Sequence, residues 1–372
     1  MFDRYILDKA LARETLTTHE AAALLTEAPF DDLVSAADSV RAALHPGDTV
    51  TWQIDRNVNI TNICVSGCKF CNFHVKGSNN PRGYITTLDE YDAKIERMLE
   101  LGGDQLLLQG GMHPRLDIGY YEELFRELKR RYPSVKLHAL GPPEIFHIAR
   151  ISRITVAETL ERLRKAGLDS LPGAGAEILS TPLRRDISPG KCTAEQWLEV
   201  MAEAHRQNIP TSATMMFGHK ETPEELAGHL ISIRDLQARR PEGTYGFIAF
   251  IAWPYCSGGT VLESEGVVSH TSPEDYLRVV ATARLVLDNI DNIQASWLTV
   301  GLDTGLKALR CGANDMGSIM IEENVVSSTG LSDTVIDARR MVAAIRSAGF
   351  RPQLRDQLYR PREVKSIIDD TM

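Results

Sequence analysis

Three cysteines lie close together near the start of the chain, with the spacing Cys64-x3-Cys68-x2-Cys71. Thiolates are soft ligands, and in proteins they select zinc or the iron of an iron–sulfur cluster. Gly67 lies between the first two cysteines and permits a tight path of the backbone. The clustered trio therefore predicts a metal centre. The remaining cysteines are far apart in the sequence and are interpreted as structural thiols: Cys192, Cys256 and Cys311.

The count of ligands leaves two kinds of metal centre open. A structural zinc site is closed by four protein ligands, and His74 could supply the fourth. Three thiolates on a loop after a strand better suit a 4Fe–4S cluster whose fourth iron stays open to a small molecule. The cluster is the favoured prediction. A zinc-stabilised barrel that only binds a ligand is the alternative from another functional class.

The elements that must position this loop follow a regular rhythm, in which short β-branched or apolar runs alternate with amphipathic stretches. Capping patterns such as Thr87-x-x-Glu90 and Thr193-x-x-Gln196 mark helix starts between them. Eight such alternations predict a parallel (β/α)8 barrel of the α/β class, with a doubly wound open sheet as the alternative. The candidate strands cover residues 50–60, 105–108, 135–140, 170–172, 211–217, 245–252, 293–299 and 317–321.

The expected organisation has three parts. Residues 1–48 precede the strand–helix rhythm and are expected to form an N-terminal helical extension that covers the bottom of the barrel. Residues 49–350 are expected to form the barrel, with the cluster loop at 64–71 and a C-terminal helix. Residues 351–372 are expected to be a C-terminal tail. No linker or low-complexity tract divides the sequence.

The composition limits the classes of partner. The 372 residues are 43% hydrophobic and 24% charged, as in an ordinary globular chain. Fifty acidic against 41 basic side chains give a net charge of −9, which lacks the basic surplus of a protein that binds nucleic acid or an anionic membrane. No apolar run approaches the roughly 20 residues of a membrane span. We therefore expect a cytoplasmic protein that binds neither nucleic acid nor membrane.

The segments after the predicted strands are the places to look for an active site, because a (β/α)8 barrel presents its site at the carboxyl ends of its strands. These segments are rich in glycine and in carboxylates, for example at Gly110-Gly111, Glu144 and Glu177. Glycines permit close approach of backbone to a ligand, so several together predict a sizeable ligand on the rim. Trp253 and Trp297 are expected either to stack on a flat ring or to pack between helices.

The segment CVSGCKFC resembles the cluster motif of the radical S-adenosylmethionine enzymes, C-x3-C-x-aromatic-C, with Phe70 at the aromatic position. This resemblance implies that Cys64, Cys68 and Cys71 hold a 4Fe–4S cluster whose open iron binds S-adenosyl-L-methionine. In such enzymes one electron cleaves this cofactor to methionine and a 5′-deoxyadenosyl radical.

The same resemblance implies two further contacts with the cofactor. Gly110 and Gly111, after the second strand, would border the methionine amino group. Glu177, with the glycines before it, would lie near the cofactor ribose. An external electron donor such as flavodoxin or ferredoxin is the implied protein partner.

Further segments spread over most of the chain carry a closer resemblance, among them LLLQGGMHP, GPPEIFHIA, SATMMFGHKETPEE, NIQASWLTVG and GANDMGSIMIEENVVSSTG. Together they resemble the cyclic dehypoxanthine futalosine synthase family of the futalosine route to menaquinone. The nearest relatives of that family are the aminofutalosine synthases and the subunits that make the deazaflavin (FO) chromophore of coenzyme F420. The chain departs from the expected family pattern at residues 73–76, 173–177 and 253–257.

This second resemblance implies a reaction on a small molecule, dehypoxanthine futalosine. The radical would remove hydrogen from the ribose C4′, and the new carbon radical would attack the benzoate ring. Loss of one electron and one proton would then give a spirocyclic product, so a base is required. His219 is the favoured base, and Glu144, Asp315 and Glu322 are further candidates near strand ends.

Two alternatives within the superfamily differ in substrate. An aminofutalosine synthase would add the radical to an enol pyruvyl double bond instead of abstracting hydrogen. An FO synthase subunit would require a tyrosine-derived substrate.

Overall fold

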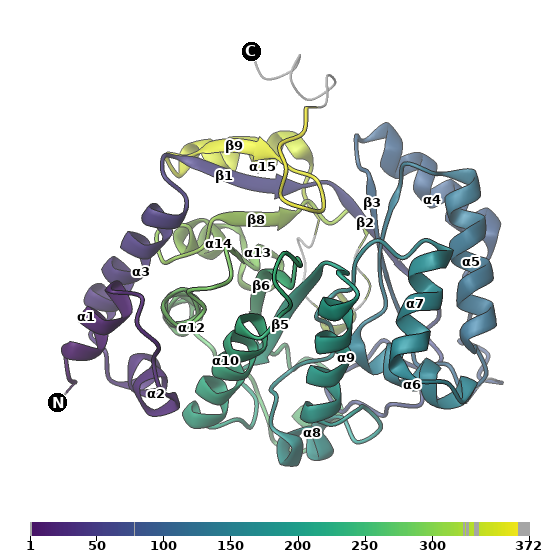
Figure 1. Cartoon of the computed structure of the whole chain (residues 1–372), viewed down its shortest axis with the longest axis horizontal. Helices are drawn as coiled ribbons and strands as arrows, with labels where there is room; N and C mark the ends of the chain where they lie inside the picture. The colour runs from purple at the N-terminus through teal and green to yellow at the C-terminus, as the bar shows by residue number, and fades with distance from the viewer. Residues whose placement is uncertain (1, 78, 323, 325–326, 331–334, 364–372) are drawn as a thin grey trace.

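The computed structural model describes residues 2–77, 79–322, 324, 327–330 and 335–363, and places parallel strands at the centre with helices outside them (Figure 1). All strand pairings between named strands are parallel, as the alternation of strands and helices predicts. The strands are β1 (Thr49–Gln53), β2 (Asp55–Asn59), β3 (Gln105–Gln109), β4 (Lys136–Ala139), β5 (Thr211–Phe217), β6 (Phe247–Pro254), β7 (Asn292–Gln294), β8 (Asp315–Ser318) and β9 (Arg351–Leu354).

The strands form two sheets that follow a barrel-like path. One has the order β5-β6-β7-β8-β1-β9 and the other the order β2-β3-β4. Only Ile54 separates β1 from β2, which connects the sheets at one side. At the other side, single bridges from Ser170 to His138 and from Leu171 to Thr211 connect β4 to β5. The parallel α/β class is confirmed. The predicted strand at 170–172 is reduced to these bridges, and the strand predicted at 293–299 ends at Gln294 because a helix begins at Trp297.

Helices flank the strands, and several begin as their sequences predict. Thr87 and Thr193 each accept a hydrogen bond from the backbone N–H three residues on, and the side chains of Glu90 and Gln196 accept from the capping residues in return. The helices are α1 (Tyr5–Leu11), α2 (Thr18–Thr26), α3 (Phe30–Leu44), α4 (Leu88–Glu100), α5 (Ile118–Arg131), α6 (Pro142–Ser152), α7 (Val156–Ala166), α8 (Thr181–Ile187), α9 (Ala194–Arg206), α10 (Pro223–Ala238), α11 (Val261–Ser264), α12 (Pro273–Val286), α13 (Trp297–Val300), α14 (Leu302–Ala308), α15 (Ala338–Ser347) and the 3-10 turn η1 (Ser327–Thr329).

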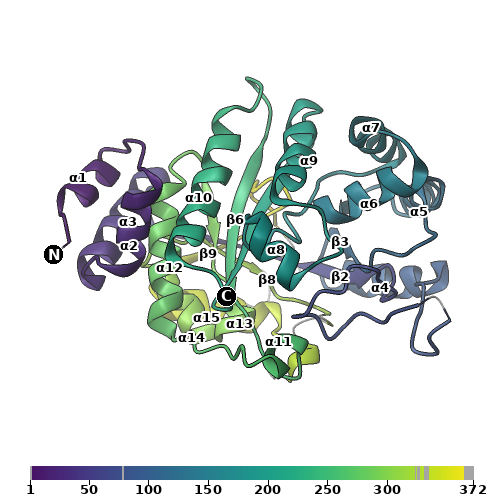
Figure 2. The ribbon, with the colours of Figure 1, turned by 90° about the horizontal axis from the view of Figure 1, so that it is seen from below.

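The N-terminal extension is helical, as predicted, but its predicted place at the bottom of the barrel was wrong. Helices α2 and α3 lie against the outer helices α10 and α12 (Figures 1 and 2). Arg278 of α12 donates to the carbonyl oxygen of Ala28 at 2.7 Å. The apolar face of α2 is rich in alanine, which lets it approach these helices closely. None of the helices in the described ranges combines the length and the apolarity that a membrane crossing requires.

The expected C-terminal tail begins with a strand of the sheet. β9 pairs with β1 from Thr49 opposite Arg351 to Trp52 opposite Leu354, so the boundary predicted at residue 350 was wrong. The strand has only four residues and includes Pro352, a residue that sheets tolerate at an edge, where its missing N–H breaks no ladder. β9 is such an edge strand. Residues 364–372 lie outside the described residues.

Candidate active site

A cavity with a volume of about 470 Å³ lies between the strands of the two sheets. This volume is typical of a site for a small molecule. The cavity is lined by the loop after β2, by alternate residues of the strands and by the segment after β9. Its lining includes eight of the eleven predicted catalytic, cofactor and metal residues: Cys64, Cys68, Phe70, Cys71, Gly110, Gly111, Glu144 and Glu177.

The cysteine loop follows β2 and is bonded to neighbouring loops through its backbone. The N–H of Val65 donates to the carbonyl oxygen of Met112 at 3.0 Å. The N–H of Lys69 donates to the carbonyl oxygen of Ile187 at 2.8 Å. Gly67 has a φ of +64°, the left-handed conformation that the tight path between two cysteines requires. These contacts fix the thiols at the end of the cavity that we call the mouth, which is lined by the cysteine loop, Gly110, Gly111 and Glu177.

Gly110 and Gly111 follow β3 and pack directly against the start of the cysteine loop. A Cβ atom on Gly111 would lie 2.3 Å from the carbonyl oxygen of Ile63, so no larger residue fits there. The N–H of Gly111 also donates to the carbonyl oxygen of Thr61 at 2.7 Å. The two glycines thus hold the backbone that leads into the cysteine loop, in addition to lining the cavity.

The sulfur atoms lie among hydrogen-bond donors. The Sγ of Cys64 accepts from the backbone N–H of Met112 at 3.2 Å and of Ser66 at 3.4 Å. The Oγ of Ser66 lies 2.9 Å from that sulfur and 3.3 Å from the Sγ of Cys68. Burial raises the pKa of the Cys68 thiol to about 11, so binding of iron there must displace a proton. Donors around cysteine sulfur are a means by which proteins stabilise and tune iron–sulfur clusters.

The arrangement of the thiols fits a cluster better than a zinc ion. Within the described ranges, no three His, Cys, Asp or Glu side chains converge closely enough to hold one metal ion. His74, the candidate fourth zinc ligand, directs its Nδ1 to the carbonyl oxygen of Cys71 at 2.9 Å. In a cluster each cysteine binds a different iron, so the sulfur atoms need not converge on one point.

Glu177 lies on the cavity wall between two cations. Its Oε1 lies 2.7 Å from Nζ of Lys191, and its Oε2 lies 3.2 Å from Arg184. Burial alone would raise the pKa of Glu177, but the two cations hold it below its ordinary value. Lys191 also lies over the ring of Phe70, 5.2 Å from its centre. Lys191 could not be predicted from the sequence, because it follows no strand end and belongs to no motif.

Glu144 caps helix α6 and faces the cavity. Its two carboxylate oxygens accept from the backbone N–H of Gly141 at 2.7 Å and of Gly110 at 3.1 Å. Burial is the largest influence on this group and raises its pKa to about 7. A carboxyl group with such a pKa can exchange a proton near neutral pH. Of the four candidate bases, all in the described part of the chain, Glu144 alone lines the cavity.

His219 does not line the cavity, contrary to its selection as the favoured base. Its side chain is fully buried, with Nδ1 3.0 Å from the carboxylate of Glu221. Its Nε2 lies 3.1 Å from the carbonyl oxygen of Met216. Both ring nitrogens are thus occupied in holding the loop after β5, so His219 is not placed to act as a base on a ligand in the cavity.

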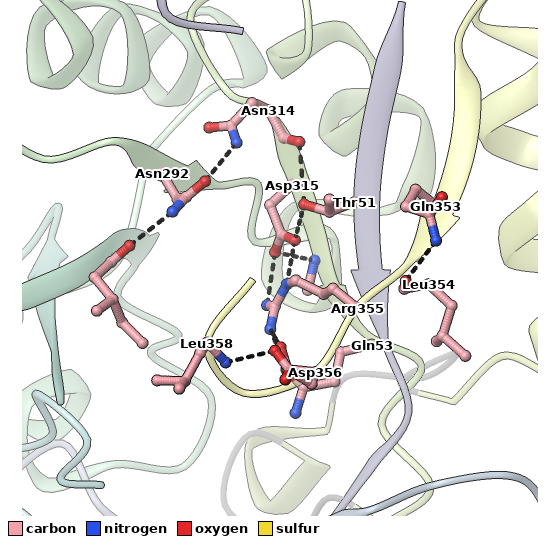
Figure 3. A network of polar contacts seen from close by, with 12 residues as sticks. Thr51, Gln53, Asn292, Asn314, Asp315, Gln353, Leu354, Arg355, Asp356 and Leu358 are labelled. Carbon is pink, nitrogen blue, oxygen red and sulfur yellow. Dashed lines mark hydrogen bonds and ion pairs between the residues drawn. The ribbon is translucent and has the colours of Figure 1, made fainter. Parts of the chain in front are cut away.

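Asp315 and Glu322 also lie outside the cavity lining, in ion pairs. Asp315 receives two hydrogen bonds from Arg355, at 2.6 and 3.0 Å, and one from Thr51 at 2.5 Å (Figure 3). Glu322 pairs with Arg56 at 2.8 Å. Each carboxylate neutralises a neighbouring cation, so neither is placed to take a proton from a ligand in the cavity.

Trp253 of β6 and Trp297 of α13 both line the cavity. Trp297 is buried and donates its indole N–H to the carbonyl oxygen of Ser318 at 3.0 Å. Ala249 and Ile251 of β6 extend the same lining. This part of the wall is therefore apolar and aromatic, which suits a flat ring.

Comparison with known proteins gives the family. Residues 58–232 match the radical SAM superfamily, and residues 244–368 match the family described as the CofH/MqnC C-terminal region. The chain is 41% identical to a cyclic dehypoxanthine futalosine synthase of Streptomyces coelicolor, over 95% of this chain and 87% of the relative. It is 38% identical to the same enzyme of Halalkalibacterium halodurans, over 95% and 93% of the two chains.

A second group of relatives carries a different name. The chain is 38% identical to a 5-amino-6-(D-ribitylamino)uracil–L-tyrosine 4-hydroxyphenyl transferase of Methanothermobacter thermautotrophicus, over 96% of this chain and 97% of the relative. Among solved structures, methylornithine synthase superposes with a TM-score of 0.71 at 20% identity, covering 93% of this chain and 97% of that one. That likeness supports the fold. Since the relatives match along nearly its whole length, the chain belongs to the radical S-adenosylmethionine superfamily and is an enzyme whose cofactors are a 4Fe–4S cluster and S-adenosyl-L-methionine.

Proposed function

We propose that this enzyme cyclises dehypoxanthine futalosine. The observation that carries the proposal is the 41% identity over 95% of the chain to a protein named for that reaction. The match of residues 244–368 to the CofH/MqnC C-terminal region supports it, because this region contributes β6 to β9 to the cavity. The apolar wall at Trp253 and Trp297 suits the benzoate ring of this substrate.

Cys64, Cys68 and Cys71 would hold the cluster, with N–H donors from Ser66 and Met112 on the first sulfur. When bound, the cluster and S-adenosyl-L-methionine supply a carbon radical that removes a hydrogen atom. The protein itself positions the reacting atoms, excludes water and accepts a proton. An electron donor such as flavodoxin or ferredoxin would deliver the electron from outside.

Three further residues would contact the cofactor. Gly110 and Gly111 line the cavity beside the cysteine loop, where they would border the methionine amino group. Glu177 is held charged by Lys191 and Arg184, and a carboxylate so fixed can accept hydrogen bonds from the hydroxyls of the cofactor ribose. Phe70 lies under Lys191 and limits the space available on this side.

Glu144 replaces His219 as the proposed base. Its position on the cavity wall and its pKa of about 7 allow it to take up one proton at neutral pH. In the proposed cyclisation the substrate would lose one hydrogen atom from ribose C4′, which the bound cofactors would accept. Glu144 would accept the proton that the ring loses, and one electron would pass to an external acceptor, so the product would be two hydrogens lighter.

The test is an anaerobic incubation. Protein reconstituted with iron and sulfide would be mixed with reductant, S-adenosyl-L-methionine and dehypoxanthine futalosine deuterated at C4′. Mass spectrometry is expected to show a product that has lost one deuterium and one hydrogen, and deuterium in 5′-deoxyadenosine. Deoxyadenosine without deuterium and without such a product would contradict cyclisation.

Transfer of a hydroxyphenyl group is the second candidate function. Six relatives named for that reaction are 36 to 38% identical to this chain. The same incubation with L-tyrosine and 5-amino-6-(D-ribitylamino)uracil separates the two functions. A product that contains both the uracil and the hydroxyphenyl group would favour the transferase.

A further inference from the structure

The end of the cavity farthest along the strands from the cysteine loop is polar. Asp55 and Gln105 are the first residues of β2 and β3, whereas the cysteine loop follows the carboxyl end of β2. The residues at this end all line the cavity and are all buried. We call them the floor: Gln53, Asp55, Asn57, Gln105 and Arg355.

Arg355 determines which amide atoms of the floor act as donors and which act as acceptors. Its Nε and Nη2 donate to the two oxygens of Asp315, and its Nη1 donates to Oε1 of Gln53 (Figure 3). Because Oε1 of Gln53 faces this cation, its Nε2 faces Asp55, at 3.5 Å from Oδ2. The positive charge of Arg355 is thus matched by Asp315.

The second amide of the floor is oriented by Asp55 in turn. Nε2 of Gln105 donates to Oδ2 of Asp55 at 3.2 Å, which leaves Oε1 of Gln105 as an acceptor. That oxygen is buried and has no partner in the described structure. Asn57, two residues after Asp55 on the same face of β2, has a buried Oδ1 that also lacks a partner there. Both residues line the cavity, but in the structure these two oxygens are shielded, so the floor offers acceptors to a ligand when the amides turn toward the cavity.

A hydroxylated group is the ligand that fits such a floor. An anion would be repelled by the oxygens of Asp55 and Gln105, because the nearby cation, Arg355, is already paired with Asp315. Burial lowers the pKa of His138, which also lines the cavity, to about 3, so that ring adds no positive charge. An apolar ring would leave buried acceptors unpaired, which is costly. Hydroxyl groups donate to such acceptors and carry no charge.

We propose that the floor binds a hydroxyl-bearing carbon unit of the substrate, with Asn57 and Gln105 accepting its hydroxyl protons. This inference deepens the proposed function, since dehypoxanthine futalosine carries a ribose. It does not depend on that substrate alone, because the ribityl chain of the second candidate substrate presents the same chemistry. The floor would therefore serve either reaction.

The test is a binding measurement on Asn57→Leu. The change removes one cavity-facing amide at nearly constant volume. Isothermal titration would use protein loaded with cluster and S-adenosyl-L-methionine but without reductant, so that no turnover occurs. The probes are dehypoxanthine futalosine and 5-amino-6-(D-ribitylamino)uracil. The probe that the native protein binds is expected to bind about tenfold more weakly to the variant, as for loss of one hydrogen bond.

Two controls make the result specific. Gln207→Leu changes an amide on the outside, where Gln207 bonds the carbonyl oxygen of Ala157, and should keep native affinity. The second control is a set of analogues of the bound probe, each of which lacks one sugar or ribityl hydroxyl. One of these analogues should bind to native protein about tenfold more weakly than the complete probe does. That analogue should bind to Asn57→Leu with the same affinity as to native protein, because the hydrogen bond is already absent. Gln105→Met is the second floor variant, and circular dichroism shows that each variant is folded.

The possible results distinguish failure of the floor assignment from failure of the proposed cyclisation. Equal affinity of the native protein and both floor variants for the bound probe would overturn the inference, as would failure of both probes to bind native protein. Binding of the ribityl compound alone, weakened by Asn57→Leu, would keep the floor assignment while the proposed cyclisation fails.

Discussion

The mouth and the floor of the same cavity are built in different ways. At the mouth, the cysteine loop and the glycine segments are each continuous in sequence, and Glu177 is paired with two cations. In the floor, Arg355 bonds Gln53 across 302 positions of sequence and has one carboxylate partner, Asp315. The part proposed to hold the cofactors can thus be predicted from short sequence motifs. The part proposed to hold the substrate depends on contacts between distant segments.

The largest effect is expected when a single cysteine, Cys64, Cys68 or Cys71, is changed to alanine, because this removes a cluster ligand at the mouth and leaves the floor unchanged. Each variant should lose cofactor cleavage completely, because a cluster with two protein ligands is not held, while the fold persists. Release of 5′-deoxyadenosine and bound iron would be measured, with circular dichroism as a check on folding. Cys311 does not line the cavity, so the Cys311→Ala variant should keep its iron. Undiminished cleavage in any of the three would refute that ligand.

Breaking the floor should affect stability most. Arg355→Met leaves Asp315 buried without its cation, which typically costs about 3 to 5 kcal/mol. Urea unfolding of the iron-free protein measures this loss. The double variant Arg355→Met with Asp315→Asn removes both charges and should recover part of it. A loss below about 1 kcal/mol in the single variant would show that the pair does not organise the floor.

The free energy of unfolding, measured as a function of pH, tests the environment of Glu144. Burial raises the pKa of this carboxyl from 4.5 to about 7. Its contribution to stability is therefore present below about pH 4.5 and is lost as the pH rises through about 7. The expected loss is at most roughly 3.5 kcal/mol, from about 1.4 kcal/mol for each pKa unit. Glu144→Gln should unfold with a correspondingly flatter pH dependence, and equal slopes for the two proteins would contradict the raised pKa.

The smallest effect is expected from Lys191→Met. Glu177 keeps Arg184 at 3.2 Å when Lys191 is removed, so its charge stays compensated. The free energy of unfolding should fall by about 1 to 2 kcal/mol, less than for Arg355→Met. Urea unfolding of the two variants side by side tests this ranking. If Lys191→Met lost as much stability as Arg355→Met, Arg184 would not compensate the charge of Glu177 when Lys191 is removed.

Local signals explain what could be predicted. The capping pairs at Thr87 and Thr193 act within one turn of helix, so their sequence spacing suffices to place helix starts. The cysteine spacing likewise lies within one loop. His219 shows the limit of such reasoning, because a place after a strand does not fix where a side chain points. Its ring turns back to the carbonyl oxygen of Met216 instead of facing the cavity.

Long-range pairing explains what could not be predicted. The four residues of β9 have no alternation that marks a strand, and their pairing with β1 depends on a partner about 300 positions earlier. Arg355 follows β9 and reaches the floor only through that pairing. Lys191 is similar, since only the folded path brings it beside Glu177 and Phe70.

The pairing of β9 with β1 also sets the order in which the molecule can be completed during synthesis. Ribosomes add about 5 to 20 residues per second, so the 302 positions between Gln53 and Arg355 take roughly 15 to 60 s to make. During that interval the outer edge of β1 has no neighbour, and exposed edges invite pairing with other chains. A nascent chain can therefore assemble its cysteine loop early. It gains a complete cavity only when Arg351–Leu354 has emerged and docked.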